Sequence, residues 1–174
     1  SNAMAALQCF ENIIEKNGVE ALRPVRLVSF ECDLDPLRLA AKHATFFPHL
    51  RHGAPHALLS QGRWAHVSGK WVWELHHGDF LEKFAATPAP DVIFYDPFST
   101  KTDSALWVPA VFQRIAAHCG AKPAELFTYS SATAVRVALL AGGFFVGEGV
   151  STGPRAATTV AMTRRDGGHH GPAA

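Results

Sequence analysis

The sequence has few cysteines and no long apolar segment, and each of these absences excludes a class of protein. Its three cysteines, Cys9, Cys32 and Cys119, are too far apart for the paired spacing of a zinc site or a disulfide framework. No segment approaches the roughly 18 consecutive apolar residues that a membrane helix requires, and no basic-then-apolar leader opens the chain. We therefore expect a cytoplasmic protein with reduced cysteines, no metal and no membrane association.

The sequence also has almost no net charge. Sixteen basic and fifteen acidic residues give a formal net charge of +1, which does not indicate a polyanionic partner, so contact with RNA would require a local patch. A chain of 174 residues with 48% hydrophobic content is long enough for one domain. We expect that domain to span residues 4–163. Residues 1–3 resemble the remnant of an expression tag, and the Gly-, His- and Pro-rich residues 164–174 are expected to be disordered.

The order of the expected elements predicts an α/β fold. Helices alternate with strands, and two closing strands without a helix between them predict an antiparallel edge hairpin on a parallel sheet. A further hairpin is expected around Ser68-Gly69, and residues 46–62 are interpreted as a His-, Pro- and Gly-rich loop. The expected helices are 5–17, 35–43, 104–119 and 133–141, and the expected strands are 25–30, 63–68, 70–76, 91–95, 125–129, 144–149 and 157–163.

Three acidic residues follow predicted strands, at the positions where open α/β sheets bind ligands. Glu31 ends the strand 25–30, Asp79 follows His76-His77-Gly78, and Asp96 ends the almost wholly apolar run 91–95. That run is typical of a central parallel strand covered on both faces. In nucleotide-binding sheets, an acid at the end of the second strand commonly accepts hydrogen bonds from ribose hydroxyls, a role that suits Glu31.

Two sequence blocks carry a resemblance to a known family. The first is DVIFYDPFSTKTDSALW from Asp91, and the second is FTYSSATAVRVALLAGGFFV from Phe127, followed by Gly153-Pro154-Arg155. Together they resemble the S-adenosylmethionine (SAM) methyltransferase domain of the bifunctional enzymes that complete 5-methylaminomethyl-2-thiouridine at the wobble position of tRNA. The resemblance extends weakly upstream through VSFECDLDPLRLA. It implies a Rossmann-like sheet, SAM as cofactor and tRNA as a partner, without the flavin-dependent oxidase domain of the bifunctional members.

The resemblance also implies roles for individual residues. Glu31 would hold the SAM ribose and Asp79 would lie near the adenine, with the neighbouring Cys32 and Phe80 also in the cofactor site. Asp96, Pro97 and Phe98 would form the floor where the methyl donor meets the amine, with Asp96 closest to the chemistry and also in contact with the cofactor. The residues expected on the substrate side are Ser99, Lys101, Trp107, Ser130, Ser131 and Arg155. Packing is the alternative for Phe98 and Trp107, and capping of the next helix is the favoured alternative for the two serines.

One feature of the family is lacking at the beginning of the sequence. The family binds the methionine end of SAM with a strand and a Gly-rich turn before the first helix, whereas no glycine precedes Gly18 here. The resemblance therefore implies a sheet without its first strand and glycine loop, through a start site inside a longer reading frame or a degenerate paralogue. We expect weak or absent SAM binding, and exposed sheet edges that a homodimer partner could cover.

Other functions remain open from the sequence. A SAM methyltransferase that acts on a small molecule or a protein would share the fold, since folds do not fix substrates, and a non-catalytic binding module is a further alternative. The histidines at positions 43, 49, 52 and 56 lack a partnering cysteine and are interpreted as solvated loop residues rather than zinc ligands. Nucleophilic catalysis has less support, because no Gly-x-Ser-x-Gly sequence occurs.

Overall fold

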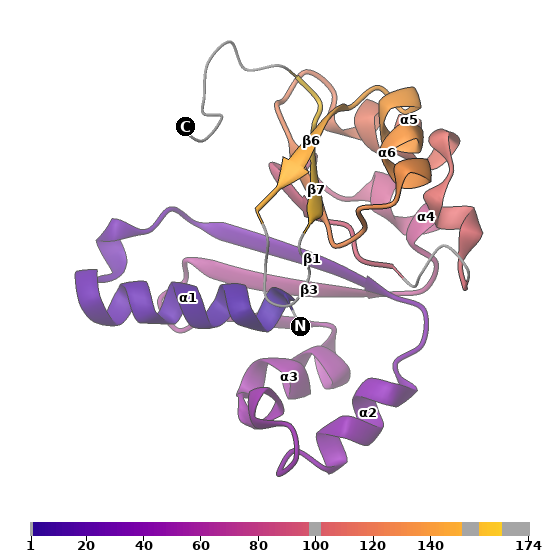
Figure 1. The fold of residues 1–174 in the computed structure, drawn as a ribbon. Coiled ribbons are helices and arrows are strands. Elements are labelled where there is room, and N and C mark those ends of the chain that lie inside the picture. Colours follow the sequence, from indigo (N-terminus) through magenta and orange to yellow (C-terminus); the bar gives the residue numbers. More distant parts are fainter. Residues whose placement is uncertain (1, 98–101, 151–156, 165–174) are drawn as a thin grey trace. The chain divides into compact units, whose positions relative to one another are not determined.

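The computed structural model describes residues 2–97, 102–150 and 157–164. The chain divides into two compact units, which we call unit 1 (Ser1–Thr87) and unit 2 (Pro88–Ala174). Each unit combines helices with its own sheet (Figure 1). That α/β composition confirms the predicted fold class. None of the helices in the described ranges is long and apolar enough to cross a membrane.

Unit 1 begins with helix α1 (Asn2–Asn17), which the 310 turn η1 (Val19–Ala21) follows. Met4, Leu7 and Phe10 recur at helical spacing, and these side chains are buried. They pack in one hydrophobic cluster with Ala54, Leu58, Trp71 and Trp73. The helix extends two residues into the expected tag remnant, and Ala3 packs against the same cluster.

The sheet of unit 1 has the order β1-β3-β2. β1 (Val25–Glu31) pairs in parallel with β3 (Trp71–His77), which pairs antiparallel with β2 (Arg63–Ala65). The predicted hairpin around Ser68-Gly69 is therefore confirmed. Alternation along the strands places Val25, Leu27 and the two tryptophans of β3 on the face that joins the hydrophobic cluster of α1.

The connection from β1 to β3 is largely helical. It contains α2 (Asp35–Lys42), the 310 turn η2 (Pro48–Arg51) and α3 (Gly53–Gln61). The interpretation of residues 46–62 as a loop is therefore wrong. The ring of His52 accepts the N–H of Ala54, the second residue of α3, at 3.0 Å, and Gly62 ends the helix with a left-handed φ of 69°. A histidine N-cap is uncommon, which explains why the sequence pattern did not indicate it.

Unit 1 closes with a short helical segment after β3. α4 (Phe80–Lys83) continues into the 310 turn η3 (Phe84–Ala86). The Phe80 ring packs edge-on against Phe30 of β1 at a centroid distance of 5.2 Å and stacks on Phe84 at 4.8 Å. These ring contacts attach α4 to β1 next to Glu31.

The sheet of unit 2 has the order β4-β5-β7-β6. β4 (Val92–Phe94) pairs in parallel with β5 (Glu125–Thr128). β7 (Thr158–Met162) pairs antiparallel with both β5 and β6 (Phe145–Gly149), which confirms the predicted edge hairpin. β7 is thus inserted between the two strands that precede it in the sequence.

The helices of unit 2 pack around one hydrophobic core. The predicted helix 104–119 is divided into the 310 turn η4 (Ser104–Trp107) and α5 (Pro109–Cys119), because Val108 precedes a proline and has an extended backbone. α6 spans Thr133–Ala141, as predicted. Phe112, Leu126 and Leu139 are fully buried in this core.

β1 and β4 each lie at an edge of their sheet. The expectation that 91–95 is a central strand covered on both faces is therefore wrong for the described structure, because β4 pairs only with β5 and its Val92 and Phe94 side chains are 49% and 53% exposed. Parallel strands are normally covered on both faces, so an exposed parallel edge strand is unusual.

Candidate functional site

In unit 1, the carboxyl ends of β1 and β3 bring two of the predicted acids to the same edge of the sheet. The parallel register places Glu31 beside His77. The N–H of Gly78 donates to the carbonyl oxygen of Glu31 at 2.9 Å, which joins the two strand ends. Asp79 follows immediately as the N-cap of α4. The topology therefore places these acids where open α/β sheets bind ligands.

The carboxylate of Glu31 is exposed at this edge and is oriented by the turn that follows it. Its Oε1 accepts the backbone N–H of Asp33 at 3.1 Å, and the Cys32 Sγ lies 3.8 Å from the same oxygen. Asp33 in turn accepts the N–H of Asp35, the first residue of α2, at 2.9 Å. The turn thus holds Glu31 on the solvent side of the strand end with one carboxylate oxygen engaged.

Asp79 and Phe80 have structural contacts of their own. The Asp79 Oδ1 accepts the N–H of Leu81 at 2.6 Å, which makes it a side-chain cap of α4. The turn before it requires a glycine, because Gly78 has a φ of 131° and a Cβ there would meet the Lys83 side chain at 2.3 Å. The positive φ of Gly78 therefore sets the direction in which the chain enters Asp79 and Phe80.

In unit 2, Asp96 and Pro97 are tied to the end of the neighbouring strand. The Asp96 Oδ1 accepts the backbone N–H of Tyr129 at 3.2 Å, and the Tyr129 hydroxyl donates to the carbonyl oxygen of Pro97 at 3.3 Å. These two bonds cross-link the segments after β4 and β5. Tyr129 is a residue that the sequence pattern did not single out, although its place at the end of a predicted strand could have indicated it.

Trp107 lies in the interior behind this cross-link. It is 6% exposed and packs edge-on against Tyr95 at 5.3 Å and Tyr129 at 6.4 Å. Tyr95 is also buried, and its hydroxyl donates to the carbonyl oxygen of Leu106. Burial, with a smaller effect of the Asp103 carboxylate, raises the pKa of Tyr95 well above its usual range, so the phenol stays neutral. Trp107 therefore packs against Tyr95 and Tyr129 from the interior of unit 2.

Ser130 is held by a buried polar network, in which Arg136 takes part. The Thr159 hydroxyl, 1% exposed, donates to the carbonyl oxygen of Ser130 at 2.7 Å and accepts from the Arg136 Nε at 3.1 Å. Arg136 also donates to the carbonyl of Thr158 and to Glu148, both between 3.3 and 3.4 Å. Its guanidinium is therefore held by contacts with β6 and β7.

The favoured capping role of the two serines is not found. The N-cap of α6 is Ala132, and no side chain caps this helix. Ser130 instead accepts a long hydrogen bond from Ala132 N–H at 3.5 Å, and Ser131 is exposed. Four other predicted site residues lie outside the described residues: Phe98, Ser99, Lys101 and Arg155.

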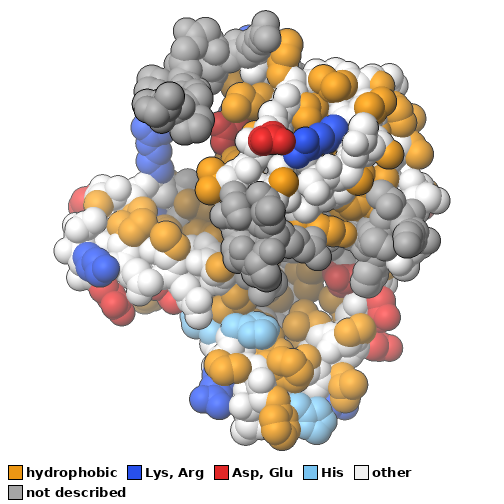
Figure 2. Space-filling view, viewed as in Figure 1, with side chains coloured by type: hydrophobic (Ala, Val, Ile, Leu, Met, Phe, Trp, Pro, Cys, Tyr) orange, Lys and Arg blue, Asp and Glu red, His pale blue; other side chains and the backbone are white. Residues whose placement is uncertain are grey.

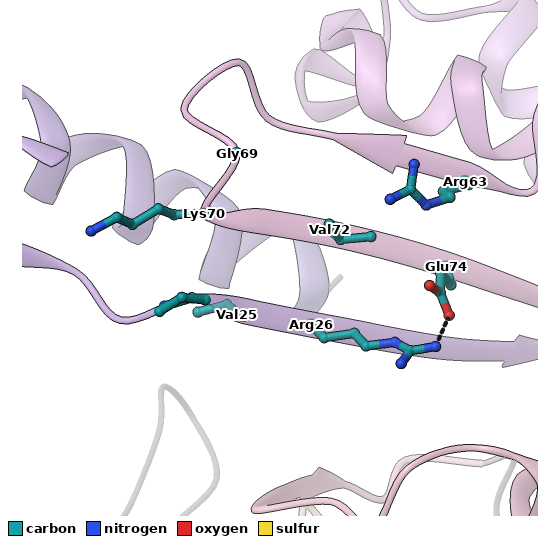
Figure 3. A pocket seen from close by; sticks show the side chains of 8 residues that line it. Val25, Arg26, Arg63, Gly69, Lys70, Val72 and Glu74 are labelled. Atoms are coloured by element: carbon teal, nitrogen blue, oxygen red, sulfur yellow. Dashed lines mark hydrogen bonds and ion pairs between the residues drawn. The ribbon is translucent and has the colours of Figure 1, made fainter. Parts of the chain in front are cut away.

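A shallow groove of about 380 Å³ lies elsewhere on unit 1, at the amino ends of β1 and β3 (Figure 3). Arg26 and Glu74 form an ion pair across its floor at 2.8 Å, while Arg63 and Lys70 flank it. A strand rises by about 3.3 Å per residue, so Arg26 lies roughly 16 Å from Glu31 along β1. The groove therefore does not belong to the edge that carries the predicted acids.

Comparison with known proteins identifies the class of protein. Residues 42–164 match the model of the family described as S-adenosyl-L-methionine-dependent methyltransferase. The match covers more than half of the chain, and the chain belongs to this family, whose cofactor is SAM.

A solved structure has a similar fold. It is the crystal structure of MnmC2 from Aquifex aeolicus, with a TM-score of 0.57 and 21% sequence identity over 88% of this chain. The chain spans 57% of that protein's length. At this level of identity the likeness supports the fold. None of the curated proteins matches.

The residues at the carboxyl end of β1 fit the adenosine part of SAM. An exposed carboxylate at a strand end, as Glu31 provides, suits a ribose diol, because it accepts two hydroxyl hydrogens. The fit therefore concerns the adenosine end.

Proposed function

We propose that this chain transfers a methyl group from SAM to the aminomethyl nitrogen of 5-aminomethyl-2-thiouridine at the wobble position of tRNA. Membership of the SAM-dependent methyltransferase family carries the proposal. The choice of tRNA rests on the resemblance of DPFSTKTDSALW and YSSATAVRVALLAGGFFV, and the fold of MnmC2 supports it.

In this proposal, unit 1 binds the cofactor. Glu31 accepts hydrogen bonds from the ribose hydroxyls, while Cys32, Asp79 and Phe80 border the adenosine. When bound, SAM supplies an electrophilic methyl group on a positively charged sulfur. The hydrogen bond from Asp33 to Glu31 holds the carboxylate in place before binding, so less rotamer freedom is lost on binding.

Unit 2 acts on the amine in this proposal. The neutral amine nitrogen forms a bond to the methyl carbon while the carbon–sulfur bond breaks, and the sulfur keeps the electron pair. The nitrogen then loses a proton, which the Asp96 carboxylate accepts directly or through water. Pro97 and Phe98 are proposed to contact the amine beside Asp96. The proposed substrate contacts are Ser99, Lys101, Ser130, Ser131 and Arg155, with Trp107 in support.

The cross-links at the strand ends support Asp96 and Ser130 as positioned residues. Asp96 is held by the N–H of Tyr129, and the carbonyl of Ser130 is held by the buried Thr159. A transfer by direct displacement depends mainly on alignment of the reacting atoms, so loops fixed by interior contacts suit it. Thr159 and Arg136 are therefore positioning residues in this proposal.

The first test is SAM binding by titration calorimetry. The chain is tested as it stands and in a form extended upstream in the same reading frame. In whichever form binds, Glu31→Ala should weaken SAM at least ten-fold, through loss of two charge-assisted hydrogen bonds, each worth about 1.5 kcal/mol or more. The matched control Glu82→Ala, an exposed acid of α4, should leave the affinity unchanged. No SAM binding by either form would contradict the proposal.

The second test separates the substrate from the cofactor. Transfer of a labelled methyl group is measured with tRNA that carries 5-aminomethyl-2-thiouridine and with the same tRNA lacking the aminomethyl group. We expect label only in the first tRNA, and an Asp96→Asn variant should lower kcat by about 100-fold as its proton acceptor is lost. SAM binding combined with methylation of neither tRNA would indicate a small-molecule or protein substrate instead.

A further inference from the structure

The near-zero net charge of the chain conceals a strong asymmetry along the sequence. Residues 36–73 contain no aspartate or glutamate, yet they hold five of the sixteen basic residues and five of the ten histidines. The remaining eleven basic residues are outnumbered by all fifteen acidic residues. One stretch of unit 1 is therefore distinctly basic while the rest of the chain is acidic.

Part of this stretch forms an exposed surface that is both basic and aromatic. We call it the Phe46 surface, and it consists of Leu39, Lys42, His43, Phe46, Phe47 and Arg51. Phe46 is 79% exposed, Leu39 61% and Phe47 40%. Figure 2 shows hydrophobic and histidine side chains gathered at the bottom of the view, where Figure 1 places α2 and α3.

Backbone turns hold the members of the Phe46 surface close together. The N–H of Phe46 donates to the carbonyl of His43 at 3.0 Å, directly after α2. The Arg51 guanidinium donates to the carbonyl of Thr45 at 3.0 Å, which folds η2 back onto the same turn. The surface is thus a folded feature and not an extended tail.

Two cations of this surface form no ion pair with the acids that the structure describes. Arg38, on the same helix, pairs with Asp35 at 2.9 Å. Lys42 and Arg51, in contrast, form no ion pair with any residue in the described ranges, and both are exposed. Two unopposed cations beside two exposed phenyl rings match the chemistry of a nucleic acid, in which phosphates alternate with flat bases.

We propose that the Phe46 surface binds single-stranded RNA, with Phe46 stacking on a base while Lys42 and Arg51 contact the flanking phosphates. The inference rests on the proposed function and identifies where unit 1 would contact its tRNA. The location supports it, because α2 begins four residues after Glu31, on the connection that leaves the proposed cofactor edge. Sequence-specific recognition of RNA targets unpaired loops, as in an anticodon, whose bases can stack on aromatic side chains.

The test is the binding of a fluorescein-labelled anticodon stem-loop RNA, followed by fluorescence anisotropy without SAM. Phe46→Ala should weaken binding about five-fold or more, which is the loss typical of one stacked base. Lys42→Glu should weaken it further at low salt and reduce the slope of log K against log salt by about one. Leu140→Ala and Lys16→Glu serve as controls, because both residues are exposed and lie outside residues 36–73.

The outcomes are distinguishable from a failure of the proposed function. RNA binding that both surface variants weaken would support the inference even if no methyl transfer were found. Equal affinity of Phe46→Ala, Lys42→Glu and the wild type would overturn it, provided that circular dichroism shows all of them folded. Sedimentation velocity in which Phe46→Ala abolishes a dimer, with RNA binding unchanged, would also overturn it and would assign the surface to contact between two copies.

Discussion

The two units have sheets of similar construction but place their polar groups differently. Each unit has one parallel strand pair that an antiparallel strand extends. In unit 1 the acid at the strand end is exposed, and a basic aromatic surface follows it along the chain. In unit 2 a buried threonine and an inward-facing arginine fix the strand ends. The difference indicates that unit 1 presents groups for binding while unit 2 holds groups in alignment.

The largest effect is expected from a substitution in the core of unit 2. It tests whether this core is as well packed as the comparison requires. Phe112 is fully buried against Tyr95 and Phe144. Phe112→Ala should lower the free energy of unfolding by about 3–5 kcal/mol, since it leaves a cavity. Phe46→Ala makes the same chemical change on the surface of unit 1 and should cost within about 0.5 kcal/mol. Urea unfolding measures both, and similar costs would contradict the structure.

A smaller effect is expected from substitution of His52, which caps α3 in unit 1. The His52 ring accepts the N–H of Ala54 through Nδ1 and faces the Glu11 carboxylate through Nε2 at 3.1 Å. His52→Ala should destabilise the protein by about 1 kcal/mol, through loss of the cap of α3. His52→Asn keeps a capping oxygen and should recover much of that loss. Thermal unfolding of both variants tests this, and equal melting temperatures for the two would argue against a capping role.

The smallest effect is expected from a change of pH, with no change of sequence. Burial raises the pKa of the Cys119 thiol, with a partly opposing backbone hydrogen bond, and burial likewise raises that of Tyr95. Both groups belong to unit 2. Because the folded state keeps these protons longer than the unfolded state, stability should fall as the pH rises above about 8.5, the ordinary cysteine pKa, and further above about 10, that of tyrosine.

Thiol labelling measures the difference in burial between the cysteines of the two units. Cys9 and Cys32 are exposed and belong to unit 1, whereas Cys119 is buried in unit 2. A thiol reagent at pH 8 should therefore modify two cysteines rapidly, and the third only on the timescale of opening of α5. Peptide mass spectrometry identifies the sites. Rapid labelling of Cys119 at pH 8 would show that unit 2 opens easily, which the comparison excludes.

The sequence predicted the parts of the fold that depend on local patterns. Apolar runs that end in an acid located β1 with Glu31 and β4 with Asp96, and helical periodicity gave α6 its bounds. The sequence pattern does not predict α3, because Gly53 and Pro55 are typical of loops, although a proline is well tolerated in the first turn of a helix. A local pattern gives only the types of residue. Whether a helix cap forms depends on the position that a side chain such as His52 takes in the folded chain.

The parts of the site that were missed depend on contacts between distant residues. The link from Arg136 to Thr159 joins positions 23 residues apart, and the bond from Tyr129 to Asp96 joins positions 33 residues apart. No periodicity encodes such pairs. The exposure of β4 was likewise not predictable, since burial of a strand depends on which neighbours pair with it. Strand-end acids could therefore be identified, while the groups that orient them could not.

The insertion of β7 between β5 and β6 has a consequence for the order in which the molecule is made. All strand pairs of unit 1 form within residues 25–77, so its sheet can assemble on the ribosome while unit 2 is still being synthesised. β5 must instead wait for β7 to emerge, more than twenty-five residues later, before its second edge is paired. Translation thus completes the proposed binding unit first and leaves β5 as an aggregation-prone edge until β7 emerges from the ribosome.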